Sequence, residues 1–197
     1  MLIDAPIYYD KKRIVGGNVK DYLLRKYSNY DSVELSKTCK INMPNLLQKN
    51  YGDDMDCSLT SVTECVMYHY KKEKGKDLTA EEVYAVVEEI AKKYFYNGKS
   101  YGTIPVFIKN IYDKTLEHFG LSKIKTKQKY FKQVGFSMYS IKEQANKQIP
   151  MIFSIFRDGR NYYNDHSITI VGYEDFILRN SKTGAIKNVT MLLVQDH

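Results

Sequence analysis

Before residue 148, apolar residues recur every three or four positions, which is the spacing of helices that bury one face. A helix is predicted from Cys57 to about Lys74, and its apolar face holds Leu59, Val62, Val66 and Tyr70. Further helices are expected around VKDYLLRKYS (residues 19–28), within residues 77–96 and 102–120, and in the shorter segment YSIKEQANKQ (139–148).

Capping residues mark the ends of two of these helices. Thr79 precedes an apolar run, and Glu82 lies three positions after Thr79, which is the spacing of a capping box. Thr103 is the predicted N-cap of the helix within residues 102–120, and Gly120 is expected to end that helix.

After residue 148 the chain consists of runs rich in β-branched and aromatic residues, which predict strands. The runs are IPMIFSIF (149–156), HSITIVGYEDFIL (166–178) and NVTMLLVQD (188–196). Residues 180–188, NSKTGAIKN, supply the turn of a hairpin between the last two. Helices followed by antiparallel strands indicate the α+β class, with a helical N-terminal half packed on an antiparallel sheet from the C-terminal half.

Composition fits one core domain with an appended arm. Of 197 residues, 43% are hydrophobic, which is enough for a sizeable core. We expect a core domain over residues 46–197 and an N-terminal arm over residues 1–45 that packs on it; the arm contains one predicted helix and no chemical motif.

The basic charge does not indicate a nucleic-acid partner. The net charge is +7, but the lysines are scattered, and blocks such as KKEKGK and KIKTKQK are short and interrupted. Such blocks are typical of a solvated surface. No nucleic-acid partner is therefore expected.

Cysteine use and hydropathy exclude several other classes. Cys39, Cys57 and Cys65 are odd in number and have no CxxC spacing, which argues against a disulfide framework and a zinc site. No metal and no cofactor are expected. No apolar run approaches the roughly 18 residues of a membrane span, and the first ten residues lack the order of a signal peptide. We expect a soluble protein, either cytoplasmic or secreted if a signal peptide has been removed.

Cys57 stands where a thiolate would be stabilised. It follows a polar turn at the predicted helix start, where unpaired backbone N–H groups and the helix dipole favour an anion. A cysteine nucleophile also needs a base, which converges on it in space. Of the four histidines, His69 and His118 lie within amphipathic helices and His197 is terminal, which leaves His166 at the start of a strand.

These segments resemble a known family. DCSLTSVTECVMYHY, followed by DHSITIVGYE and then MLLVQD, is similar to the papain-like cysteine peptidases of the bacteriocin-processing, or double-glycine, type. The resemblance covers roughly residues 46–197 and implies a papain-like fold. It also implies a catalytic triad of Cys57, His166 and Asp196, with a peptide or protein as the substrate.

The sequence departs from the family pattern at two places. Relatives place a glutamine about six residues before the cysteine as an oxyanion donor; here that position is Tyr51, and Gln48 lies nearby. Relatives also continue beyond the aspartate, whereas this sequence ends at His197. Either the sequence is a piece of a longer chain, or another residue orients the histidine; Asp175 and Asn180 are the alternatives.

An acidic run, Asp53, Asp54 and Asp56, precedes the cysteine, although negative charge beside a thiolate raises its pKa. We interpret the run as a solvated turn in which Asp56 is the N-cap of the helix. An electronegative subsite for a basic substrate residue is the alternative.

The resulting hypothesis is a cysteine peptidase that acts through an acyl-enzyme. Two alternatives stay open: a transglutaminase-like acyltransferase on the same scaffold, in which only the acceptor differs, and a catalytically inactive binding domain that keeps the fold.

Overall fold

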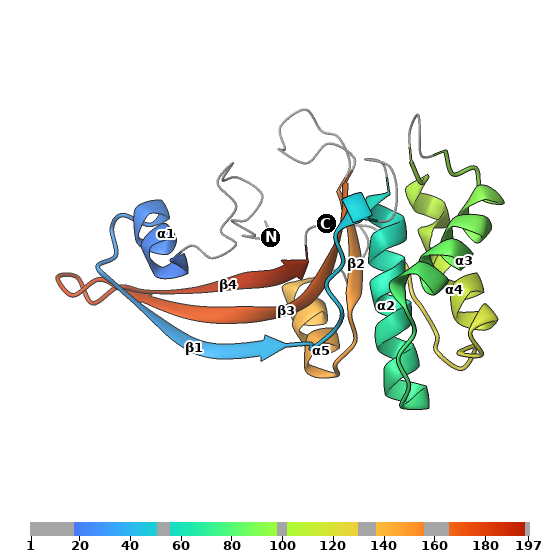
Figure 1. The fold of residues 1–197 in the computed structure, drawn as a ribbon. Coiled ribbons are helices and arrows are strands. Elements are labelled where there is room, and N and C mark those ends of the chain that lie inside the picture. The colour runs from blue at the N-terminus through green and yellow to red at the C-terminus, as the bar shows by residue number, and fades with distance from the viewer. Residues whose placement is uncertain (1–17, 51–55, 98–101, 130–136, 156–165, 196–197) are drawn as a thin grey trace.

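The computed structural model describes the chain except for residues 1–17, 51–55, 98–101, 130–136, 156–165 and 196–197. It confirms the α+β class: helices at one end pack against a four-stranded antiparallel sheet. In Figure 1 the sheet extends from the helical end as a long curved ribbon, so the molecule is elongated.

The central helix α2 (Cys57–Lys74) has the bounds predicted from the apolar spacing. Two further helices, α3 (Ala80–Lys92) and α4 (Ile108–His118), pack on the side of α2 that faces away from the sheet (Figure 1). The core between the three helices is built from aliphatic side chains such as Leu59, Val62, Val66, Val83, Val87, Ile111 and Leu116. This core fixes the position of α2.

The sheet contains β1 (Ser32–Lys40), β2 (Met151–Ile155), β3 (His166–Arg179) and β4 (Ile186–Gln195). β3 is the long central strand and pairs antiparallel with each of the others. β2 pairs with its first five residues, β1 pairs further along the same edge, and β4 lies on the other edge. The hairpin predicted between the last two strands is confirmed.

An irregularity after Ile170 changes which side chains of β3 face each side of the sheet. The register with β4 slips between Ile170 and Gly172, as in a β-bulge. Before the slip, Ser167 and Thr169 face α2; after it, the side chains of Phe176 and Leu178 are on that face. The first residues of β3 therefore present polar side chains to α2, and its later residues present apolar side chains on the same face of the sheet.

Two short helices cover the sheet away from α2. α5 (Met138–Asn146) packs on one face through Ile141 and Ala145, and α1 (Val19–Lys26) buries Leu23 on the opposite face (Figure 1). The sheet therefore has separate hydrophobic cores with α5 and α1, apart from the core of the three helices.

The predicted N-cap of α3 and the predicted glycine stop after α4 are confirmed. Thr79 and Glu82 form the reciprocal bonds of a capping box at the start of α3. Gly120, with φ 68°, follows the end of α4, where a glycine stop was expected. At the start of this segment, however, the prediction of Thr103 as N-cap is wrong.

Proline explains the error at Thr103. The segment instead opens with the 3₁₀ turn η3 (Pro105–Phe107), and α4 begins after it. Ile104 precedes the proline and is extended, because the residue before a proline is sterically kept out of the helical region. The Thr103 hydroxyl is buried and has no hydrogen-bond partner among the described residues.

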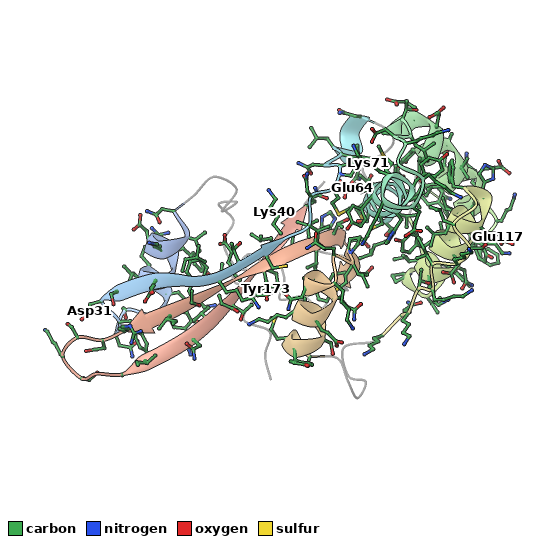
Figure 2. All side chains as sticks on the ribbon, turned by 90° about the horizontal axis from the view of Figure 1, so that it is seen from below. Asp31, Lys40, Glu64, Lys71, Glu117 and Tyr173 are labelled. Atoms are coloured by element: carbon green, nitrogen blue, oxygen red, sulfur yellow. The ribbon has the colours of Figure 1, made fainter. Side chains whose placement is uncertain are left out.

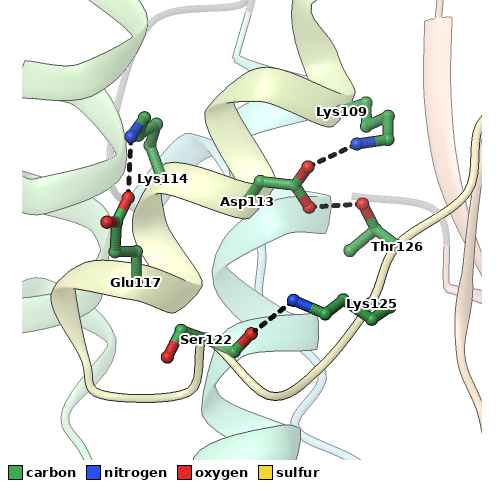
Figure 3. A network of polar contacts seen from close by, with 7 residues as sticks. All are labelled: Lys109, Asp113, Lys114, Glu117, Ser122, Lys125 and Thr126. Carbon is green, nitrogen blue, oxygen red and sulfur yellow. Dashed lines mark hydrogen bonds and ion pairs between the residues drawn. The ribbon is translucent and has the colours of Figure 1, made fainter.

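The segment after α4 is tied back to the helix by polar contacts, shown in Figure 3. Asp113 accepts bonds from Lys109 on its own helix and from the Thr126 hydroxyl, while Lys125 bonds the Ser122 carbonyl at 3.2 Å. These contacts are on the surface far along the chain from Cys57, and they hold the helical end together.

The N-terminal arm contributes more than the predicted helix. β1 lies within residues 1–45, where no strand was predicted, and pairs with β3 from Ser32 to Lys40. Most of its side chains are exposed, so its apolar residues give only a weak alternating pattern. The division of the chain at residue 45 stays a prediction.

Gly172 marks the closest approach between β1 and β3. Its φ is 153°, and an added Cβ would lie 2.0 Å from the Cys39 carbonyl oxygen. Gly172→Ala should therefore lower the free energy of unfolding by about 2–4 kcal/mol, through the clash and the backbone strain.

Gly184→Ala is the matched control, because its φ is also positive (71°) but an added Cβ meets nothing within 4 Å. It should lose only about 1–2 kcal/mol. Urea unfolding measures both variants, and equal losses would contradict the close approach of β1.

Candidate active site

Cys57 is the first residue of α2 and its side chain is buried at the junction with the sheet. Its Sγ accepts a hydrogen bond from the backbone N–H of Ser167 at 3.2 Å. Ser167 is the second residue of β3. The start of the helix and the start of the strand therefore meet at the sulfur, as the sequence predicts for a helix-borne nucleophile.

His166, the first residue of β3, contacts the same sulfur. Burial raises the pKa of the Cys57 thiol, whereas the hydrogen bond and the charge of His166 lower it. The Ser167 N–H and the Ser58 hydroxyl act in the same direction. The net effect is a pKa below the ordinary value of a thiol, which favours a thiolate beside an imidazolium.

A line of three hydroxyls sets the register of this junction. Ser58 Oγ lies 2.8 Å from Ser167 Oγ, which lies 2.9 Å from Ser154 Oγ on β2. The line connects α2, β3 and β2 directly behind Cys57 and His166. Because each of these bonds is buried or half-buried, sliding the helix along the sheet would leave polar groups unpaired at a cost of about 1–3 kcal/mol each.

Asp56 has a different environment from the predicted one. It occupies the N-cap position of α2, but its side chain makes no capping bond and is buried rather than solvated. Instead its two carboxylate oxygens accept hydrogen bonds from the hydroxyls of Tyr84 and Tyr96. Burial, and then the bond to Asp56, raise the pKa of each tyrosine, so both stay protonated donors.

The two alternative orienters are far from His166. Asp175 lies nine positions further along β3, about 30 Å at the rise of a strand. It bonds Lys142 of α5 at 2.6 Å and the Thr190 hydroxyl at 2.6 Å. Asn180 lies in the hairpin turn and accepts from the backbone of Lys182 and Thr183. The structure brings neither to the sulfur.

Several predicted residues lie outside the described residues. These are Tyr51, Asp53, Asp54 and Asp196. Gln48, three positions before Tyr51, is among the described residues. It opens the 3₁₀ turn η2 (Gln48–Asn50), and its side chain is buried. In Figures 1 and 2, η2, in cyan, lies beside the amino-terminal part of α2.

The segment before η2 is attached to α2 by a buried carboxyl. The Leu46 backbone N–H donates to Glu64 Oε1 at 2.7 Å. Glu64 is labelled in Figure 2 on α2, close to the sheet. Gln48 is thus only two residues from a fixed point on the helix that presents Cys57.

Two further observations concern metal binding and membrane-spanning helices. Within the described ranges, no three histidine, cysteine, aspartate or glutamate side chains are placed to hold a metal ion. In the same part of the chain, no helix combines the length and the apolar character needed to cross a membrane.

The geometry agrees with a comparison against protein families. A family model described as "Peptidase_C39 like family" matches residues 40–191 of the 197-residue chain. The chain belongs to the Peptidase_C39-like family. Comparison with curated proteins gave no match.

In this Peptidase_C39-like chain, the matched range includes all of α2 and β3, and so both Cys57 and His166. It ends at Met191, within β4. The α+β fold and the antiparallel sheet are those of a papain-like peptidase. Membership supports a cysteine peptidase at the level of the family.

Sequence reasoning missed the residues that support the site. Ser154 and Ser167 were not singled out, although each lies in a predicted strand, and Tyr84 and Tyr96 were assigned only to a helix. The usable signal was weak: a tyrosine at the predicted end of an amphipathic helix, and serines that interrupt apolar strands. Nothing local indicates that they meet residues 13 to 109 positions away.

The reactivity of Cys57 is the first test of the site. Iodoacetamide should modify it with a pH midpoint below that of a free thiol, about 8.5, because the imidazole stabilises the thiolate. In His166→Ala the midpoint should rise, since the largest lowering contribution to the Cys57 pKa is lost. Mass spectrometry of the alkylated peptide follows the reaction.

Cys65 is an internal control, because it is fully buried and its pKa is raised by burial. It should stay unmodified while the protein is folded. The same midpoint in the wild type and in His166→Ala would show that the imidazole does not activate Cys57.

Proposed function

We propose that this protein is a cysteine peptidase that hydrolyses peptide bonds through an acyl-enzyme formed on Cys57. One observation carries the proposal: the thiol at the start of α2 contacts His166 at the start of β3, and its pKa is lowered by that contact. Thiol and base belong to separate rigid elements, joined by the bond between Ser167 and Cys57.

The reaction follows from these positions. The thiolate attacks the carbonyl carbon of the peptide bond, and a tetrahedral oxyanion forms. The His166 imidazolium then donates its proton to the leaving amine, and the carbon–nitrogen bond breaks to give a thioester. The now neutral imidazole takes a proton from water, which attacks the thioester and releases the acid. Thiolate and imidazolium are restored.

The oxyanion needs preorganised donors. One is the backbone N–H of Cys57 in the first turn of α2, where N–H groups have no partner within the helix. The side-chain donor is Gln48 or Tyr51. The buried position of Gln48, and the attachment of its segment to α2, favour Gln48.

Asp196 is the proposed third residue, which accepts a hydrogen bond from the imidazole and fixes its orientation. The register of the sheet supports it. β4 runs antiparallel to β3, and its last described residue, Gln195, pairs with Thr169, three positions from His166. Asp175 is engaged by Lys142 and Thr190 at the other end of the strand.

Acyl transfer and a purely binding role are the competing functions. Acyl transfer uses the same pair and replaces water by an amine, so product analysis separates it from hydrolysis. A binding role predicts no turnover. The lowered pKa of Cys57 supports the catalytic functions, because a binding role does not require it.

Removal of the nucleophile should abolish turnover. Cys57→Ala is expected to lower kcat/KM for a peptide substrate by more than about 1000-fold. The change also leaves the Ser167 N–H without its acceptor, so the free energy of unfolding should fall by about 1–3 kcal/mol while the protein stays folded. A pool of fluorogenic peptides, with products identified by mass spectrometry, provides the assay.

Cys39→Ala is the matched control, because this half-buried thiol lies on β1 away from the site. It should keep turnover within about twofold. Hydrolysis that persists in Cys57→Ala would refute the proposed nucleophile, and transfer to an added amine in preference to water would favour an acyltransferase.

Substitutions of Asp196 and Asp175 test which residue orients the imidazole. Asp196→Asn should lower kcat by about 100-fold or more, because an amide would favour the wrong tautomer of the imidazole. Asp175→Asn removes the ion pair with Lys142 and should affect stability while kcat stays within about twofold. If Asp175→Asn lowers kcat more than Asp196→Asn does, the role of third residue passes from Asp196 to Asp175.

A further inference from the structure

Glu64 is a buried acid that the proposed reaction does not use. It lies on α2 seven residues after Cys57, two helical turns along the same side of the helix. Its exposed fraction is 0%. A carboxyl in such a place is costly unless its environment supplies hydrogen bonds, so its presence requires an explanation.

Its contacts join three parts of the site. Oε1 accepts the Leu46 N–H at 2.7 Å, which attaches the segment before η2. The Thr169 hydroxyl of β3 lies next to the carboxyl and lowers its pKa. Thr169 lies three positions after His166. Glu64 therefore touches the strand of the proposed base and the segment of the proposed oxyanion donor.

The surroundings favour a neutral carboxyl. Burial raises the pKa of Glu64 to about 8, against the Leu46 N–H and the Thr169 hydroxyl, which lower it. The pKa of the neighbouring Cys65 on the same helix is also raised, by burial and then by Glu64.

A neutral carboxyl has a proton to donate. Thr169 Oγ1 is buried and makes no close hydrogen bond within the described part of the chain. Its cross-strand partner Gln195 also has a buried Oε1 that lacks a partner among the described residues. A neutral Glu64 can therefore donate to the Thr169 hydroxyl oxygen while its Oε1 accepts the Leu46 N–H.

We propose that Glu64 is a positioning residue of the site: its carboxyl holds the segment that carries Gln48 against the helix of Cys57 and the strand of His166. The inference rests on the proposed function. Leu46 is two residues from Gln48, so a shift of the Leu46 backbone moves the oxyanion donor as well. Misplacement of a reacting group by about 1 Å costs about 100-fold in rate.

Two substitutions separate positioning from packing. Glu64→Gln keeps an oxygen for Leu46 and an N–H donor for Thr169, whereas Glu64→Leu fills a similar volume and provides neither. At pH 6.5, kcat of Glu64→Gln should stay within about threefold of the wild type. For Glu64→Leu it should fall by about 10- to 100-fold, with KM within about threefold, because the donor acts on the transition state.

Val62→Ala is the matched control. Val62 is buried on the same helix in the core with α3 and α4, so the variant loosens α2 without touching Leu46 or Thr169. Its unfolding midpoint should fall while kcat stays within about twofold. If Glu64→Leu does not fold, Glu64→Met replaces it, because methionine adapts to irregular space and also lacks both hydrogen bonds.

The charge state provides an independent readout. Glu64 is neutral in the folded protein up to about pH 8 but ionises in the unfolded chain above its ordinary pKa of 4.5. Its contribution to stability is therefore complete below pH 4.5 and is lost as the pH rises to 8. The Tm of Glu64→Gln minus that of the wild type should increase from pH 5 to pH 8 and then level off.

Hydrogen exchange makes the inference testable without turnover. Amides of residues 46–50 should exchange at least about tenfold faster in Glu64→Leu than in the wild type, and at the wild-type rate in Glu64→Gln. If the wild type cleaves no peptide while these rates change, the proposed function fails and the attachment stands. Two results would overturn the positioning role. One is a kcat of Glu64→Leu equal to that of the wild type, and the other is a fall in its kcat equal to that of Val62→Ala.

Discussion

The contact between the first residue of α2 and the second residue of β3 is the constraint on which the rest of the site depends. Cys57 Sγ accepts the Ser167 N–H at 3.2 Å, and the next residue of the helix bonds the same strand through Ser58 and Ser167. A helix and a strand are each rigid, so two adjacent bonds fix their relative position. The imidazole of His166 reaches the sulfur because its own backbone is one residue from that contact.

Two buried acidic side chains lie at the start of α2 and along it, and hydrogen-bond donors hold each of them. The carboxylate of Asp56 accepts hydroxyl bonds from Tyr84 and Tyr96, which directs it towards the helical core, and it is not among the groups that shift the pKa of Cys57. Glu64 accepts the Leu46 N–H, and burial raises its pKa to about 8. The charge of His166 lowers the pKa of the sulfur.

The long strand β3 connects the site to a part of the sheet that does no chemistry. The slip after Ile170 changes the alternation, so that Asp175 faces α5 and binds Lys142 rather than pointing to the α2 face. Beside the slip, Gly172 admits the main chain of β1 at a distance that no side chain would allow. The N-terminal arm thus extends the same sheet in which His166 is the first residue of the central strand.

The sequence by itself determined the features that depend on neighbouring residues. The capping box of Thr79 and Glu82 involves a single turn, and the bounds of α2 follow from apolar spacing along one helix. The order of Cys57, His166 and the strands also indicated the family. Thr103 failed as a cap because Pro105 restricts the residue before it, and β1 was missed because an exposed strand carries little apolar pattern. Only the tertiary structure decided the partners of Asp56, Ser58 and Glu64. Their bonds span 18 to 109 positions, and a side chain's hydrogen-bond partner at such separations depends on how rigid elements pack.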